Sequence, residues 1–170
     1  MNTNPNFILQ VDRAFVGNVP TAPAANATTV LFATHPCTLG TGGASVSSTF
    51  TKASTGEAVV VTPDAIEELE VVFGLHDHAS ATNGVRAYYT NDGGSNWRET
   101  DMKDPNDAAT IGAAAARQVP TLSAGQEWAE IFRIGRYRGF ALTYTAGATP
   151  PTAGTGWDVS IGMKYAPQGA

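Results

Sequence analysis

The residues from Val85 to Thr100 constrain the fold more than any other stretch, because their pattern indicates two strands joined by a tight turn. Val85, Ala87 and Tyr89 alternate with polar or amphipathic neighbours, a period of two that is typical of a half-buried strand. The Asn-Asp-Gly-Gly sequence at residues 91–94 then supplies side chains that tolerate positive φ. An antiparallel β-hairpin is therefore predicted here.

The spacing Thr90-x-Asp92-x-Gly94-x-x-Trp97 resembles the Asp-box hairpin of sialidases and many other β-proteins. The resemblance implies that Asp92 fixes the turn, that Gly94 permits it and that Trp97 folds back over the hairpin. Sialidase propellers repeat the box in each blade, whereas this chain carries one copy. The motif therefore indicates scaffold rather than catalysis. Nothing in the spacing of the acidic residues nominates the carboxylate pair of a glycosidase, and no enzyme is expected.

Period-two alternation also marks the last third of the chain. Phe140, Leu142 and Tyr144 point one way in one predicted strand, and alternate residues from Trp157 to Tyr165 share a face in the next. A loop of small residues, Gly, Pro and Thr connects them. The two strands are therefore predicted to form an antiparallel pair.

Two stretches carry helix signals. Thr62, Pro63 and Asp64 form an N-cap, a first-turn proline and a first-turn acid, but period-two alternation follows at once. At most one turn of helix is expected there, followed by a strand to about Leu75. The Ala-rich residues 108–117 are predicted as a short helix, with an extended segment as the alternative.

The segments together predict about seven to nine short strands separated by turn signals. Such a pattern favours an all-β fold, an antiparallel two-sheet β-sandwich or jelly roll with at most one or two short helices. The 170 residues fit a single domain over residues 1–170. A low charged fraction of 15%, with 18 glycines and 10 prolines, is typical of a turn-rich β-protein.

Residues 19–29 contain Pro20 and Pro23 among small side chains and show no periodicity. They are predicted as an extended N-terminal arm or loop, which costs little to order because proline restricts the backbone in advance. We expect this segment to extend from the sandwich to a neighbouring molecule, with both prolines as contacts.

The charge balance and the hydropathy exclude several partners. A formal net charge of −5 argues against nucleic-acid binding. No window approaches the roughly 20 apolar residues that span a bilayer, and no basic segment precedes the apolar run at residues 7–9. Synthesis in a host cytoplasm, with no membrane partner, is the resulting expectation.

The sequence suggests no cofactor. Cys37 is the only cysteine, which rules out an intrachain disulfide, and it is interpreted as a neutral loop thiol rather than a nucleophile paired with His35. The glycine cluster from Gly40 to Gly43 lacks the Gly-Lys-Ser/Thr continuation of a phosphate-binding loop.

His76 and His78 follow the strand that ends near Leu75. Two histidines at i and i+2 of a strand project from one face, where His35 or Asp77 could complete a metal site. Their parity, however, places them opposite the core face of the strand. An exposed strand end is the favoured interpretation, and a metal site is the alternative.

Arg133, Arg136 and Arg138 form a local basic cluster that could engage carboxylates on a partner. Pairing with acidic residues of the same chain is the alternative. The acids available for such pairs are Glu67, Glu68, Glu70 and Glu130.

Residues 136–147, Arg-Tyr-Arg-Gly-Phe-Ala-Leu-Thr-Tyr-Thr-Ala-Gly, precede a Thr/Gly-rich loop and a last alternating strand. Together with the strand, turn and tryptophan from Tyr89 to Trp97, this pattern is similar to the capsid cement proteins of tailed bacteriophages. The similarity spreads over about the second half of the chain. It implies a small β-sandwich that forms a trimer on the outside of an icosahedral shell and locks neighbouring hexamers together.

The resemblance therefore implies a structural virion protein without catalysis, whose partners are the major capsid protein and further copies of itself in a homotrimer. The alternative is a carbohydrate- or receptor-binding β-sandwich of a phage tail or surface protein. Its stacking platforms would be Trp97, Trp128 and Trp157, although Trp157 shares its parity with core residues.

Overall fold

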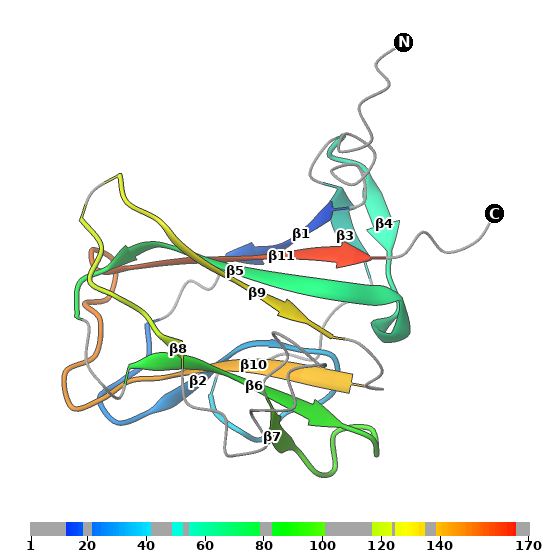
Figure 1. Ribbon diagram of the computed structural model, residues 1–170, viewed down its shortest axis with the longest axis horizontal. Coiled ribbons are helices and arrows are strands. Elements are labelled where there is room, and N and C mark those ends of the chain that lie inside the picture. Colours follow the sequence, from blue (N-terminus) through cyan, green and yellow to red (C-terminus); the bar gives the residue numbers. More distant parts are fainter. Residues whose placement is uncertain are drawn as a thin grey trace.

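The computed structural model describes residues 13–18, 22–41, 49–52, 55–78, 83–100, 117–123, 125–134 and 139–165, and these residues form two stacked antiparallel sheets (Figure 1). The first is six-stranded, in the order β4 (Ala58–Val60), β3 (Thr49–Lys52), β1 (Arg13–Asn18), β11 (Trp157–Tyr165), β5 (Ile66–His76) and β9 (Trp128–Arg133). The second is five-stranded: β2 (Thr28–Ala33), β10 (Gly139–Thr145), β6 (Gly84–Thr90) and β7 (Arg98–Thr100), with β8 (Arg117–Gln118) also paired to β6.

The all-β prediction is confirmed, since the described residues form a two-sheet antiparallel sandwich. Their only helical element is η1 (Pro63–Ala65), a single 3-10 turn that leads directly into β5. The predicted turn of helix followed by a strand is thus correct. The predicted helix over residues 108–117 lies outside the described residues except for Arg117, which belongs to β8.

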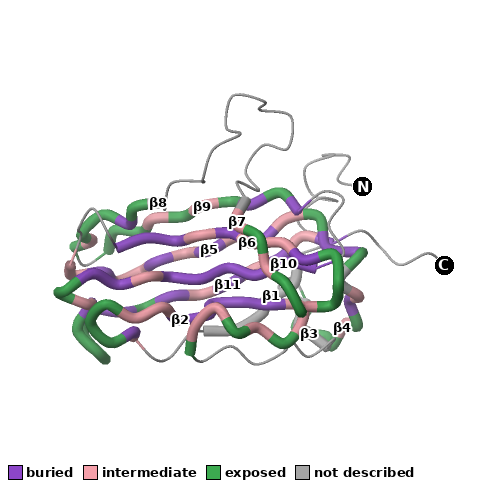
Figure 2. The backbone as a smooth tube through the Cα atoms, turned by 90° about the horizontal axis from the view of Figure 1, so that it is seen from below, coloured by how far each residue is buried: buried purple, intermediate pink, exposed green. Residues whose placement is uncertain are grey.

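The core lies between the two sheets, where inward-facing side chains from both exclude water. Buried stretches follow the central strands, and exposed stretches gather at the loops and strand ends (Figure 2). Phe73 of β5 is the centre of an aromatic cluster, with ring centroids 5.6 Å from those of Trp128 and Trp157 and 5.8 Å from that of Tyr144. Such edge-to-face and tilted pairs stabilise the packing beyond the area they bury.

The predicted pairing of the last two strands is wrong. β10 lies between β2 and β6 in the five-stranded sheet, whereas β11 lies between β1 and β5 in the six-stranded sheet. The loop at residues 146–156 therefore crosses from one layer to the other. A strand inside a covered sheet is apolar on both faces, and β10 is buried along nearly its whole length, so alternation alone did not identify its neighbours.

The outer face of the five-stranded sheet is covered by the chain itself. Val30, Ala33 and Ala141 form a second buried cluster there, separate from the main core. The half-buried side chains packed against this cluster are Cys37, Leu39, Tyr88 and Trp97. The segment after β2 and the β6–β7 turn thus shield this face from solvent.

Two β-bulges shift the phase of β5. The pairing with β11 skips one residue of β5 at Glu67 and another at Gly74. As a result Phe73 and His76, three positions apart, both face the core. The bulge at Gly74 overturns the expectation that His76 lies on the exposed face.

The described part of the predicted arm, from residue 22 onward, lies against its own sandwich. The amide of Asn26 donates to the carbonyl of Gly147 at 2.9 Å, and the amide of Ala146 donates to the carbonyl of Ala27 at 2.9 Å. Pro23 is buried, so its ring cannot serve as the exposed partner contact that was expected. The last two residues of the predicted arm, Thr28 and Thr29, belong to β2. Pro20 lies outside the described residues.

Candidate functional site

The turn between β6 and β7 is organised around the carboxylate of Asp92. Its Oδ1 atom accepts hydrogen bonds from the Thr90 hydroxyl at 2.8 Å and from the Asn96 amide at 2.9 Å. Its Oδ2 atom accepts from the Asn96 side-chain amide at 2.7 Å. Hydrogen bonds from Asn96 and then from Thr90 lower the pKa of Asp92 to about 2, so the carboxylate is ionised at neutral pH.

Glycine is favoured at two consecutive positions of this turn. Gly93 and Gly94 have φ of 71° and 93°, a region that L side chains rarely adopt. Gly94 is also crowded, since a Cβ atom there would lie 2.7 Å from the Pro36 carbonyl oxygen. Its amide donates to the Thr90 hydroxyl at 3.1 Å. The turn therefore packs closely against the segment that follows β2.

Trp97 follows the turn and packs against the second buried cluster, on the outer face of the five-stranded sheet. Tyr89 packs against the main core on the inner face and faces Arg98 across the β6–β7 ladder. The two aromatic rings therefore approach the turn from opposite faces of the same sheet.

A pocket of about 370 Å³ lies at this turn, and both aromatic residues contribute to its lining. Its lining residues are Tyr89, Thr90, Asn91, Asp92, Asn96, Trp97 and Arg98. They provide aromatic rings, two carboxamides, a hydroxyl, a carboxylate and a guanidinium within one hairpin. This is the candidate site.

The sequence motif identified Asp92, Gly94 and Trp97, but it gave no indication of the pocket. Asn91 and Arg98 were missed because neither belongs to the Thr-Asp-Gly-Trp spacing. The one available signal was the hairpin register, which places Arg98 opposite Tyr89.

The two histidines are not brought together as a metal pair. His76 is 0% exposed, and its Nδ1 and Nε2 atoms lie 2.9 Å from the Pro120 carbonyl oxygen and 2.6 Å from the Tyr144 hydroxyl. The expectation of an exposed strand end is therefore wrong for His76, because the bulge at Gly74 turns it inward. Within the described parts of the chain, no group of three or more His, Cys, Asp or Glu side chains is placed to hold a metal ion.

Asp77 joins the end of β5 to the loop between the two sheets. Its Oδ1 atom accepts a hydrogen bond from the Thr152 amide at 2.9 Å and lies 3.0 Å from Nδ1 of His78. Burial would raise the pKa of Asp77, but the hydrogen bonds from Thr152 and His78 outweigh it and lower the pKa to about 2. Asp77 and His78 therefore have a role in fixing this loop.

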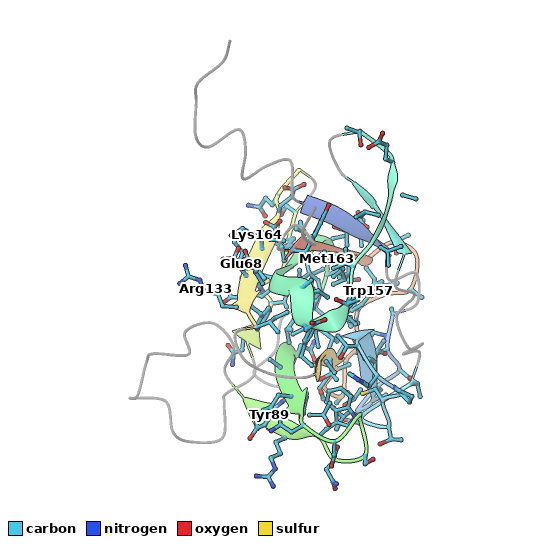
Figure 3. All side chains as sticks on the ribbon, turned by 90° about the vertical axis from the view of Figure 1, so that its right-hand side faces the viewer. Glu68, Tyr89, Arg133, Trp157, Met163 and Lys164 are labelled. Atoms are coloured by element: carbon cyan, nitrogen blue, oxygen red, sulfur yellow. The ribbon has the colours of Figure 1, made fainter. Side chains whose placement is uncertain are left out.

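The basic cluster is described only at Arg133, whose guanidinium lies 3.6 Å from the Glu68 carboxylate. On β11, which pairs with the other edge of β5, Lys164 lies 2.9 Å from the carboxylate of Glu67. Glu68, Arg133 and Lys164 lie close together on one flank of the molecule, away from Tyr89 (Figure 3). Arg133 thus pairs within its own chain, while Arg136 and Arg138 lie outside the described residues.

The three tryptophans occupy different environments. Trp157 is 6% exposed in the main core, and Trp128 packs against that core. Trp97 alone of the three lines the pocket. Cys37 lies half-buried in the second cluster, where burial raises the pKa of its thiol, and a neutral thiol is a poor nucleophile.

Comparison of the chain with protein-family models, with curated proteins and with solved structures gave no match. Among the described residues, no helix has the length and apolar character needed to cross a bilayer.

Proposed function

We propose that the protein is a structural virion protein, which binds the outer surface of a bacteriophage capsid as a homotrimer and stabilises the shell by bridging neighbouring capsomers. The similarity of residues 136–147 and of the hairpin to capsid cement proteins motivates the proposal. The observation that carries it is the asymmetry of the sandwich. The outer face of the five-stranded sheet is covered by the chain's own residues, whereas no described segment packs a hydrophobic cluster over the outer face of the six-stranded sheet.

Where β9, β5 and β11 form that open face, its described residues combine charged side chains with small and apolar ones. Across β9, β5 and β11, one row aligns Ile131, Glu70 and Gly162, and Ile131 is 39% exposed. The adjacent row aligns Arg133, Glu68 and Lys164. Small side chains let another backbone approach closely, and the charges can fix the register of a partner.

The proposed mechanism involves no chemical reaction. The protein would stabilise the shell by burying surface area across the joints between capsomers. One such contact on its own dissociates quickly. Three contacts linked in a trimer convert the second and third binding events into intramolecular ones, so that the assembly leaves the shell far more slowly than one subunit would. The major capsid protein is the proposed partner, and the protein would pass from the host cytoplasm to the outer surface of the virion.

The test is co-sedimentation with phage shells that lack the protein, combined with its mass in solution by light scattering. We expect a trimer that binds the shells. Ile131→Glu places a charge on the open face and should weaken binding by at least about tenfold, which corresponds to about 1.4 kcal/mol.

Val60→Glu is the matched control, because Val60 is 60% exposed on β4 at the opposite edge of the same sheet. It should leave binding unchanged. A monomer that does not sediment with shells would refute the proposal, and equal effects of the two substitutions would refute the assignment of the face.

A further inference from the structure

We propose that the pocket at the β6–β7 turn is a binding site for a neutral saccharide. This site lies on the five-stranded sheet and is separate from the open face of the six-stranded sheet, so it does not depend on the capsid proposal.

The size and walls of the pocket fit one or two sugar rings. Its volume of about 370 Å³ is at the small end of the range for ligand sites, about 300–1,000 Å³. Tyr89 and Trp97 are both half-buried, so each is anchored in a cluster and still reaches the pocket. Aromatic rings present flat apolar surface to the C–H faces of sugars.

The polar groups of the pocket match the mixed needs of sugar hydroxyls, each of which donates and accepts. Asn91 and Asn96 carry carboxamides that do both, Asp92 accepts, and Arg98 donates. Asn91 and Arg98 are exposed, and their side chains form no hydrogen bond or ion pair with the residues that the structure describes. Their hydrogen-bonding capacity is therefore open to a ligand.

The site is also held in shape before any ligand arrives. The hydrogen bonds of Asp92 with Thr90 and Asn96 fix the loop from within, and the two glycines allow the positive φ angles that the turn needs. A rigid site loses little conformational entropy on binding, which favours weak polar ligands such as sugars.

The charge of the pocket selects against anions. Arg98 contributes one positive charge, and the ionised carboxylate of Asp92 balances it. An anion would meet that carboxylate at close range, and the lining includes no second cation to compensate. Phosphate esters and acidic sugars are therefore disfavoured, and a neutral hexose or N-acetylhexosamine is the chemistry that fits.

The experiment is a titration of the full ¹⁵N-labelled chain, followed by NMR, with separate probes. The neutral probes are glucose, galactose, mannose, N-acetylglucosamine and N-acetylgalactosamine, each also as a β-linked disaccharide. The anionic probes are N-acetylneuraminic acid and inorganic phosphate. We expect at least one neutral probe to give saturable shifts of the amides of residues 91–98 and of the Trp97 indole N–H, and neither anionic probe to do so.

Three variants assign the site. Asn91→Ala and Arg98→Ala should each weaken binding by about tenfold, and neither removes a hydrogen bond of the turn. Ser95→Ala is the control, because Ser95 is exposed on the same turn but does not line the pocket. It removes one hydrogen bond of the turn, from the Ser95 hydroxyl to the Asp92 carbonyl at 3.2 Å, and leaves those of the Asp92 carboxylate in place. It should bind as the parent chain does. The ¹⁵N spectra of the unliganded variants report directly whether each one is folded.

Several results would overturn the proposal. The first is the absence of a saturable shift with every neutral probe up to about 100 mM, a hundredfold above a 1 mM dissociation constant. The second is a set of shifts that maps outside residues 89–98. Binding of the anionic probes alone, or full affinity in both pocket variants, would also overturn it. Shell binding by Arg98→Ala should equal that of the parent chain, which separates this site from the capsid contact.

Discussion

The Nε2 atom of His76 lies 2.6 Å from the hydroxyl of Tyr144, and this contact joins the six-stranded sheet to the five-stranded sheet inside the core. The Pro120 carbonyl, 2.9 Å from Nδ1, can only accept a hydrogen bond. The imidazole therefore carries its proton on Nδ1, and Nε2 accepts from Tyr144. In this neutral form both ring nitrogens of His76 have a hydrogen-bond partner.

Stability should fall in mild acid because of His76. Burial is the main cause that lowers the pKa of His76 below its ordinary value of 6.5. The unfolded chain then binds a proton that the folded chain resists, so the free energy of unfolding decreases as the pH falls below about 6.5. Urea titrations between about pH 7.5 and pH 5 measure this slope. His76→Gln should flatten it, and an unchanged slope in that variant would contradict the assignment.

Tyr144→Phe should destabilise the protein by about 1–3 kcal/mol, because it leaves Nε2 of His76 buried without a donor. Urea unfolding at neutral pH measures the loss. Tyr165→Phe is the control, since Tyr165 is also buried but its hydroxyl makes no hydrogen bond with the described residues. Equal losses in the two variants would mean that the contact between the sheets contributes nothing specific.

Gly94→Ala should cost more than Gly93→Ala. Both positions have positive φ, which costs a residue with a Cβ atom about 1–2 kcal/mol. At Gly93 a Cβ atom would meet no heavy atom within 4 Å, whereas at Gly94 it would lie 2.7 Å from the Pro36 carbonyl oxygen. Thermal unfolding of the pair isolates the effect of the crowding. If the two variants unfolded at the same temperature, the close packing at Gly94 would be disproved.

Asp92→Ala should loosen the turn without unfolding the domain. The substitution removes the acceptor of the Asn96 amide, so hydrogen exchange at that amide should become faster than in the parent chain. Because the pKa of Asp92 is lowered to about 2 from 3.8, the parent turn should hold above pH 3.8 and loosen as the pH falls towards 2. Exchange at the Val85 amide, within the β6 ladder, serves as the reference, and equal acceleration at both amides would indicate global rather than local opening.

The sequence was informative where one local rule decides the structure. The turn at Asp92 and Gly94, and the single helical turn before Ile66, follow from residue types and their spacing. The face of β5 on which His76 lies did not follow from the local sequence, because the bulge at Gly74 depends on pairing with β11, which is remote in the chain. The neighbours of β10 were also missed, since a strand buried on both faces carries no preference between partners.

The candidate site was only partly predictable for the same reason. Asp92 and Trp97 belong to a motif, and the motif describes how a turn is built. Whether a turn also forms a pocket depends on how Tyr89 and Trp97 pack against the two buried clusters. Residues on β2, β5 and β10 form those clusters, and they are remote from the turn in the sequence.

The strand order of the six-stranded sheet has a consequence for synthesis on the ribosome. β11 lies between β1 and β5, and the register pairs Ala14 with Met163 and Val71 with Ile161. Neither early strand can complete its hydrogen bonds until residues 157–165 have emerged from the exit tunnel. Non-local pairing of this kind slows folding and exposes strand edges in the meantime. A nascent chain therefore holds two unfinished halves of a sheet, and the final strand joins them in one late step.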